Sequence, residues 1–153
     1  MRNKKSLLIT QLEQKLQPFA ACKNSTVPPK GWIHTIRTSL NMTMEQLGNK
    51  LGITKQGIKK IEESEAKGTV SINTLKEVAN AIDMQLVYGF VPKNDTVQEL
   101  VAQKAEKLAT KIVLRTHKNM QLENQAIADE KINKAIIDLK EELIRELKKS
   151  LWD

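Results

Sequence analysis

The chain has 153 residues, of which 40% are apolar, 28% are charged and only 3% are aromatic. This length suits one compact domain with extensions, or two very small domains. A core made mostly of Leu, Ile, Val, Ala and Met favours packed helices over a sheet sandwich. Four prolines and six glycines are also too few for the many turns of an all-β chain.

The 25 lysines and arginines outnumber the 18 aspartates and glutamates, and the excess lies near the N-terminus. Residues 1–30 carry six basic residues and one acidic residue, whereas residues 31–92 and 93–153 each have a net charge of +1. Such a basic arm is typical of proteins that bind nucleic acid or another anionic surface, and it also occurs as a solubilising tail.

The single cysteine, Cys22, excludes an internal disulfide and fits a reducing compartment. No apolar run approaches the roughly 20 residues of a membrane span. The apolar stretch near the start is about four residues long, which is too short for a signal peptide. We therefore expect a cytoplasmic, nucleoid-associated protein without membrane contact.

Residues 1–27 are expected to form a basic N-terminal helix or arm. Leucines at every fourth position predict an amphipathic helix over Ser6–Phe19, with Ser6 as its N-cap, that ends at or before Pro18. Its apolar stripe consists of Leu8, Leu12 and Leu16.

Residues 28–92 carry the densest helix signals and are predicted to form one compact domain of short helices. Thr43, Thr54 and Ser71 are expected N-caps of its second, third and fourth helices. Gly52 supplies the left-handed residue that often follows a helix end. The side chains expected in the core are Trp32, Ile36, Leu47, Ile58, Ile61 and Leu75.

The segment from Met84 to Val91 alternates apolar side chains and predicts a short β-strand that ends at Pro92. A lone strand needs a partner for its backbone groups, and pairing with the same strand of a second subunit is the simplest solution. The segment can also finish the preceding helix or pack as an extended tail.

Residues 93–153 are predicted to be a helical extension made of two helices. The first begins after the N-cap Thr96 and runs to about Arg115, and the second runs from about Leu122 to Leu151. The stripe of the second helix suits a coiled-coil seam or packing on the preceding helix, and its short length favours the latter. It consists of Ile132, Ile136, Leu139, Leu143, Leu147 and Leu151. The predicted fold is all-α: a compact helix-turn-helix bundle of four to five helices, one short β-strand, then this helical pair.

The order of residues from Thr43 to Glu62 is typical of a helix-turn-helix, in which the second helix enters the major groove of DNA. Gly48 lets the two helices approach closely, and Ile53 and Ile58 are expected to pack the second helix onto the core. The residues left on its outer side are Thr54, Lys55, Gln56, Lys59 and Lys60. Their amide and ammonium groups are of the kind that read base edges or hold phosphates, although lysines on such a helix can also form only a solvated face.

Residues 42–82 resemble the phage-repressor (XRE-type) helix-turn-helix family. The resemblance implies that Lys55, Gln56 and Lys60 contact bases. Gly48 stands where that family usually has alanine, a difference expected to cost helix propensity but not packing room. The residues expected to contact phosphate are Thr54, Thr43, Lys59, Lys50, Lys4 and Lys5.

Five motifs in order, spread over about residues 28–125, resemble the mobile mystery protein A family. They are Gly31-Trp-Ile with Ile36-Arg37, Glu62 with Glu65-Ala-Lys-Gly68-Thr, Leu86-Val-Tyr with Val91-Pro92, Gln103-Lys-Ala105, and Met120-Gln-Leu-Glu-Asn-Gln125. Members of that family accompany a Fic-domain protein on mobile elements. The resemblance implies an antitoxin-like or regulatory protein that binds its own operator in double-stranded DNA, and we expect it to act as an autorepressor. A homodimer that reads a palindromic site is a further hypothesis. The helix motif of small Fic inhibitors is not matched, so neutralisation of a toxin would need another surface.

We expect no enzymatic activity, no cofactor and no metal. The two histidines are far apart, with His34 expected on the outer face of the first domain helix and His117 in a helix–helix connection. Cys22 is expected to be inert, and Glu62 to position Arg37 by an ion pair. The alternative function is a protein-interaction module that neutralises a toxin partner through the C-terminal helices, with DNA binding secondary.

Overall fold

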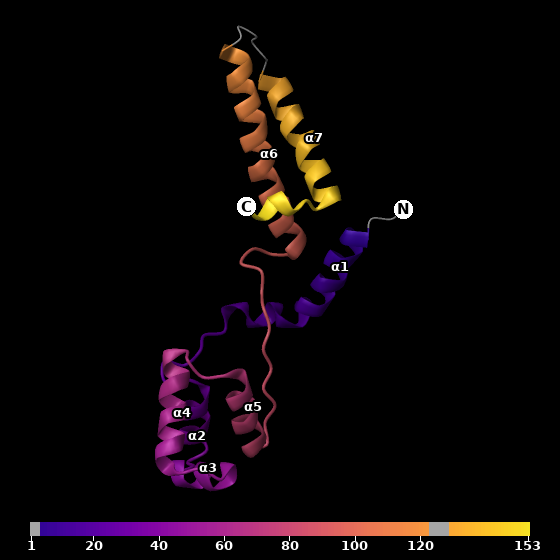
Figure 1. Ribbon diagram of the computed structural model, residues 1–153. Helices are drawn as coiled ribbons and strands as arrows, with labels where there is room; N and C mark the ends of the chain where they lie inside the picture. Colours follow the sequence, from indigo (N-terminus) through magenta and orange to yellow (C-terminus); the bar gives the residue numbers. More distant parts are fainter. Residues whose placement is uncertain (1–3, 123–128) are drawn as a thin grey trace. The chain divides into compact units, whose positions relative to one another are not determined.

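The computed structural model describes residues 4–122 and 129–153, and all regular structure in these ranges is helical (Figure 1). The chain divides into two compact units, one formed by Asn24–Gly89 and the other by Met1–Lys23 together with Phe90–Asp153. None of the described helices is long and apolar enough to cross a membrane.

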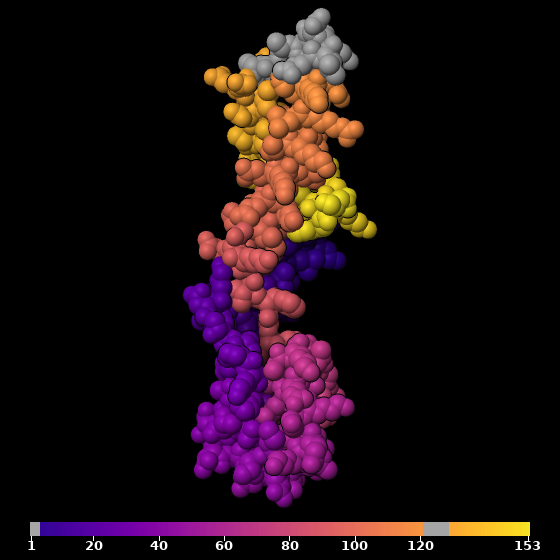
Figure 2. Space-filling model, turned by 90° about the vertical axis from the view of Figure 1, so that its left-hand side faces the viewer, coloured from indigo at the N-terminus to yellow at the C-terminus, as the bar shows by residue number. Residues whose placement is uncertain are grey.

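Four helices make up the Asn24–Gly89 unit, which appears as one continuous violet-to-magenta body in the space-filling view (Figure 2). They are α2 (Trp32–Ser39), α3 (Met44–Leu51), α4 (Lys55–Lys67) and α5 (Ile72–Ala81). Their shared core contains Ile33, Leu47, Ile58 and Val78. The predicted all-α helix-turn-helix bundle is confirmed.

The predicted caps of this bundle are confirmed as well. The hydroxyls of Thr43, Thr54 and Ser71 each accept a hydrogen bond from the backbone N–H three residues later, at 3.0–3.1 Å. Gly52 adopts the left-handed conformation, with φ of 69°, directly after α3. These local signals are what ends one helix and begins the next.

The core prediction is confirmed at Leu47 and Ile58 and wrong at Trp32, which is 47% exposed. Ile36 is only partly buried. On α2 the buried residues are instead Ile33 and Arg37, one turn apart. The buried side of α2 therefore lies away from Trp32, because the charged side chain of Arg37 turns inward to meet Glu62 of α4.

The predicted β-strand at Met84–Val91 is wrong. Among the described residues the segment has no strand partner, and it runs as an extended chain after α5. The N–H of Met84 donates to the carbonyl of Ala79 at 2.8 Å, which closes the end of α5. Val87 and Tyr88 are mostly exposed. Alternating apolar residues predict a strand only where a neighbouring edge satisfies the backbone, and no described segment supplies one.

The other unit contains the helical pair predicted for the C-terminal region, which lies side by side in Figure 1. Its helices are α1 (Lys4–Leu16), the 3₁₀ helix η1 (Gln17–Asn24), α6 (Val97–Leu122), α7 (Asp129–Glu146) and the 3₁₀ helix η2 (Lys149–Trp152). Ala105 and Ala109 of α6 pack with Leu143 of α7 and with Leu151. The last helix thus packs on the preceding one, as predicted.

Two details of the helical pair differ from the prediction. α6 continues to Leu122 rather than ending near Arg115, so His117 lies within this helix and not in a connection. The last helix, α7, is described from Asp129 and not from about Leu122, which ends α6. Residues 123–128, which include the end of the Met120–Gln125 motif, lie outside the described residues.

The α1 helix packs through a different face from the predicted one. Leu8 and Leu12 are exposed, whereas Ile9 and Leu16 are partly covered. Ser6 lies inside the helix and is not its cap. At the start of α6, Thr96 accepts from the N–H of Glu99 at 3.0 Å, which confirms it as a cap.

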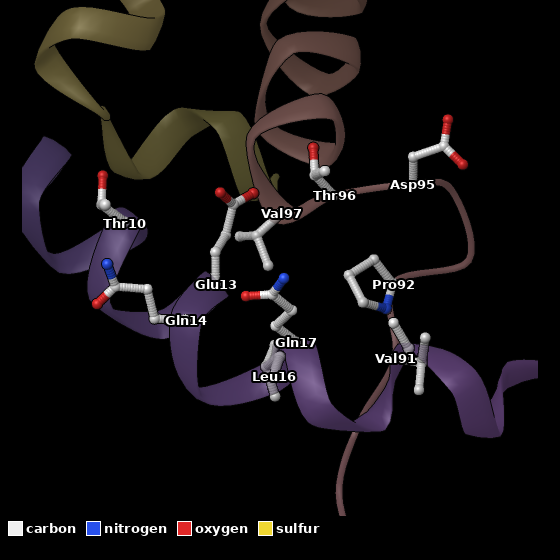
Figure 3. A pocket seen from close by; sticks show the side chains of 11 residues that line it. Thr10, Glu13, Gln14, Leu16, Gln17, Val91, Pro92, Asp95, Thr96 and Val97 are labelled. Carbon is white, nitrogen blue, oxygen red and sulfur yellow. The ribbon is translucent and has the colours of Figure 1, made fainter.

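A glutamate from α1 shares in capping α6. A carboxylate oxygen of Glu13 accepts from the N–H of Gln98 at 2.8 Å, and in Figure 3 Glu13 lies next to Val97. Glu13 and Val97 line a cavity of about 340 Å³ between α1 and residues 91–97. The N-terminal helix is thereby tied to α6.

Candidate nucleic-acid interface

The helix pair α3–α4 is joined by a turn of three residues, Gly52, Ile53 and Thr54. Gly48 lies against this turn: a Cβ atom there would be 2.6 Å from the carbonyl oxygen of Ile53. The predicted close approach at Gly48 is therefore confirmed. An alanine at this position would require the turn to shift, because the atom in the way of its Cβ belongs to the backbone.

The first turn and a half of α4 presents the predicted polar and basic side chains to solvent. Lys55, Gln56, Lys59 and Lys60 are all exposed, and so is the N-cap Thr54. The opposite face of the helix buries Ile58 and Glu62. The helix is thus amphipathic, and its outward face carries four groups capable of contacting a polyanion.

The start of α3 lies beside the start of α4. Thr43 and Gln46 form a capping box, in which the N–H of Thr43 donates to the Gln46 side-chain oxygen at 2.8 Å. A cavity of about 520 Å³ is lined by both Thr43 and Lys55. Asn41, whose φ is 54°, lines it as well and was not among the predicted site residues.

The remaining predicted contacts are divided between the two units. Lys50 is exposed in the last turn of α3. Lys4 and Lys5 belong to α1 in the other unit. The ammonium of Lys5 donates to the carbonyl of Glu146, the last residue of α7, at 2.7 Å.

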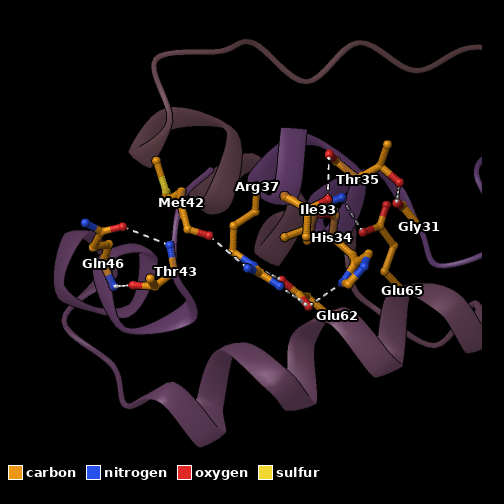
Figure 4. A network of polar contacts seen from close by, with 11 residues as sticks. Gly31, Ile33, His34, Thr35, Arg37, Met42, Thr43, Gln46, Glu62 and Glu65 are labelled. Carbon is orange, nitrogen blue, oxygen red and sulfur yellow. Dashed lines mark hydrogen bonds and ion pairs between the residues drawn. The ribbon is translucent and has the colours of Figure 1, made fainter. Parts of the chain in front are cut away.

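A buried ion pair holds α4 against α2, and Figure 4 shows it at the centre of a polar network. The Nε and Nη2 atoms of Arg37 donate to the two carboxylate oxygens of Glu62 at 2.5 and 3.2 Å. Nη1 of Arg37 donates to the carbonyl of Met42 at 2.8 Å, in the turn before α3. The predicted pairing of Glu62 with Arg37 is confirmed.

The prediction that His34 lies on the outer face of α2 is wrong, because its side chain belongs to the same polar network. Its Nδ1 lies 3.1 Å from a Glu62 carboxylate oxygen. Burial of the Glu62 carboxyl acts to raise its pKa, but the hydrogen bonds from Arg37 and then His34 outweigh burial and hold the pKa below its ordinary value. Glu62 is therefore a carboxylate matched to two donors.

A second glutamate of α4, Glu65, was not predicted to have a role. Its two carboxylate oxygens accept from the backbone N–H groups of Trp32 and Ile33 at 2.7 and 2.9 Å. The N-cap of α2 is Gly31, which has no side chain with which to cap the helix. The three-residue spacing of Glu62 and Glu65 on one face of α4 was the signal in the sequence.

The other candidate groups do not form a second polar site. Cys22 is exposed in η1. Within residues 4–122 and 129–153, no group of three or more His, Cys, Asp or Glu side chains is placed to hold a metal ion.

One of three comparisons with known proteins, the comparison with family models, gave a match, and it agrees with this geometry. The comparisons with curated proteins and with solved structures gave no match. A family model described as Helix-turn-helix matches residues 33–88, just over a third of the chain. The match spans α2 to α5, and the narrower resemblance to the mobile mystery protein A family stays a prediction. Residues 33–88 of this chain are thus similar to the helix-turn-helix family, in agreement with the α3–turn–α4 arrangement.

Proposed function

We propose that this protein is a sequence-specific DNA-binding regulator of transcription, without enzymatic activity, that reads double-stranded DNA with α4. The observation that supports the proposal best is the exposed, basic first turn and a half of α4 within a segment that matches the helix-turn-helix family model. In such motifs the second helix lies in the major groove with its N-terminal residues toward the bases.

Lys55, Gln56 and Lys60 are the proposed base contacts. A glutamine amide both donates and accepts, which matches the N6 and N7 edge of adenine, whereas a lysine ammonium only donates and matches the O6 and N7 acceptors of guanine. All three side chains are exposed on α4.

Phosphate contacts are proposed for Thr43, Thr54, Lys50 and Lys59. The hydroxyls of Thr43 and Thr54 accept their capping hydrogen bonds, which leaves each hydroxyl hydrogen free to donate to a phosphate oxygen. The positive ends of α3 and α4 add to the attraction. Lys4 and Lys5 of α1 are proposed phosphate contacts as well, and the ammonium of Lys5 also donates to the carbonyl of Glu146.

The regulator is proposed to act in the cytoplasm as a homodimeric autorepressor on a palindromic operator. Two-fold symmetric helix-turn-helix dimers place their recognition helices about 34 Å apart, one turn of DNA. Selection of duplexes from a random pool by the purified full-length protein tests both parts. The proposal predicts a motif repeated as inverted half-sites with centres about 10 base pairs apart. Recovery of no common motif would contradict sequence-specific reading.

A second proposed role is antitoxin-like binding of a Fic-domain partner through the C-terminal helices. It rests on the resemblance to mobile mystery protein A and on the exposed apolar side chains of the α6–α7 pair. They include Ile112, Leu114 and Ile137. Co-purification of the full chain with a Fic-domain protein encoded beside it tests this role. Loss of the complex in Ile137→Glu, with DNA binding retained, would support it, and absence of any complex would refute it.

A further inference from the structure

α4 is fastened to α2 at two separate points. Near the C-terminal end of α2, Arg37 binds Glu62, and at its N-terminus the N–H groups of Trp32 and Ile33 bind Glu65 (Figure 4). A single contact with α2 fixes the position of one point on α4. Two contacts, with opposite ends of α2, also fix the direction of the α4 axis. Both contacts are hydrogen bonds with strong angular preference.

The carboxylate of Glu65 suits the N-terminus of α2 in both hydrogen bonding and charge. The N-cap position of α2 has φ of 85° and no side-chain cap, so the carboxylate of another helix satisfies two of the free N–H groups. A carboxylate is also the favoured charge at the positive end of a helix. A Cβ atom at Gly31 would lie 2.8 Å from the Glu65 carboxyl carbon, so the approach leaves no space for a larger residue.

We propose that Glu65 is a positioning residue for DNA reading, which fixes the direction in which α4 presents Lys55, Gln56 and Lys60. This inference rests on the proposed role of α4 as the helix that contacts bases. Glu65 touches no DNA in this account and acts only through the angle between α4 and α2.

The expected effect follows from the length of α4. Without Glu65 the polar contacts described here between α4 and α2 converge on Glu62, which binds both Arg37 and His34, and α4 can rotate about that residue. Gln56 lies six residues from Glu62, roughly 9 Å along the axis. A rotation of about 6° then moves the first turn by about 1 Å, given that rise per residue. The buried Ile58 restrains the position of α4 but sets its direction less sharply than a hydrogen bond does, because the hydrophobic effect is non-directional. A displacement of 1 Å is enough to weaken a base contact. Such a contact favours the correct base over a wrong one by roughly 5- to 150-fold in affinity.

Glu65→Ala tests the proposal, with Glu63→Ala as the matched control. Both variants remove one negative charge from α4, but Glu63 is exposed. Affinities for a duplex selected by the wild-type protein and for a scrambled duplex are measured at a temperature where circular dichroism shows each variant folded. We expect both variants to bind scrambled DNA alike, and the selected-to-scrambled affinity ratio to fall at least about fivefold in Glu65→Ala only. Equal ratios in the two folded variants would overturn the proposal.

Two further measurements keep the test decisive. If Glu65→Ala does not fold, Glu65→Gln, which keeps the size but only one acceptor oxygen, is compared with Glu63→Gln by the same ratio. Backbone residual dipolar couplings of the free protein report the angle between α2 and α4 without DNA. If the wild-type protein shows no sequence preference, the proposed function fails, while unchanged couplings in the Glu65 variant refute the positioning role separately.

Discussion

Arg37 and Glu62 are joined by two hydrogen bonds, at 2.5 and 3.2 Å, while both side chains are more than nine-tenths buried. The pair links the last turn of α2 to the middle of α4. A buried pair of this kind adds little net stability over apolar residues of the same size, but the loss of one partner leaves an uncompensated buried charge.

Arg37→Met is therefore expected to lower the free energy of unfolding of the helix-turn-helix unit by about 3–5 kcal/mol. Adding Glu62→Leu is expected to restore most of the loss, because no charge then remains buried. Urea denaturation followed by Trp32 fluorescence in a Trp152→Phe background measures the change. A double variant no more stable than Arg37→Met would contradict this explanation.

Acid should weaken the same unit through Glu62. Its pKa in the folded protein lies below the ordinary value of 4.5, so the unfolded chain takes up a proton first as the pH falls. The stabilisation is complete above pH 4.5 and is lost as the pH falls through the lowered pKa. The stability difference between wild type and Glu62→Gln should accordingly shrink from pH 6.5 to pH 3, while Glu63→Gln should show no such trend. A difference independent of pH would show that the Glu62 charge is not the cause.

Gly48 and Gly57 should respond in opposite ways to alanine. In both helices alanine gains up to about 1 kcal/mol in propensity. At Gly48 the new Cβ meets a backbone oxygen at 2.6 Å, whereas at Gly57 it meets the end of the half-exposed Ile53 side chain at 3.2 Å. Gly48→Ala is expected to destabilise by about 1–3 kcal/mol and Gly57→Ala to be neutral or stabilising. Thermal unfolding of the two variants checks the order, and a stabilised Gly48→Ala would contradict the close approach.

The sequence predicted what depends on local chemistry. Thr43, Thr54 and Ser71 act as caps because side-chain oxygens a fixed distance from free N–H groups need no tertiary context. The pairing of Arg37 with Glu62 was predicted, but the exposure of Trp32 that goes with the inward position of Arg37 was not, because the apolar pattern of α2 alone placed Trp32 in the core. The strand prediction for Met84–Val91 was wrong because it rested on the apolar alternation alone. Among the described residues, no neighbouring strand is present to bond its backbone groups. The capping role of Glu65 was not predicted because its partners are backbone N–H groups on another helix.

Gln56→Ala should relax the sequence preference of the protein at a single base pair. The expected loss of discrimination at that position is about 1–3 kcal/mol, since an adenine-type contact loses both of its hydrogen bonds. Competition between the selected duplex and its single-base variants measures the change position by position. An equal loss of affinity for every duplex would show that Gln56 contacts phosphate instead.

Lys59→Ala should weaken binding to all sequences alike. A lysine that neutralises one phosphate contributes about 0.9 to the slope of log affinity against log salt concentration. The slope is therefore expected to become shallower by about one, with the selected-to-scrambled ratio unchanged. A change in the selected-to-scrambled affinity ratio would show that Lys59 contacts a base and not a phosphate.

The central claim is that α4 reads sequence and does not merely attract a polyanion. Fluorescence-anisotropy titration of the full-length protein with the selected duplex and a scrambled duplex, at two salt concentrations, tests it most directly. The account predicts that the preference for the selected duplex persists at the higher salt, because base contacts do not depend on counterion release. Equal affinities that fall together with salt would contradict it and leave only the basic charge of the chain at work.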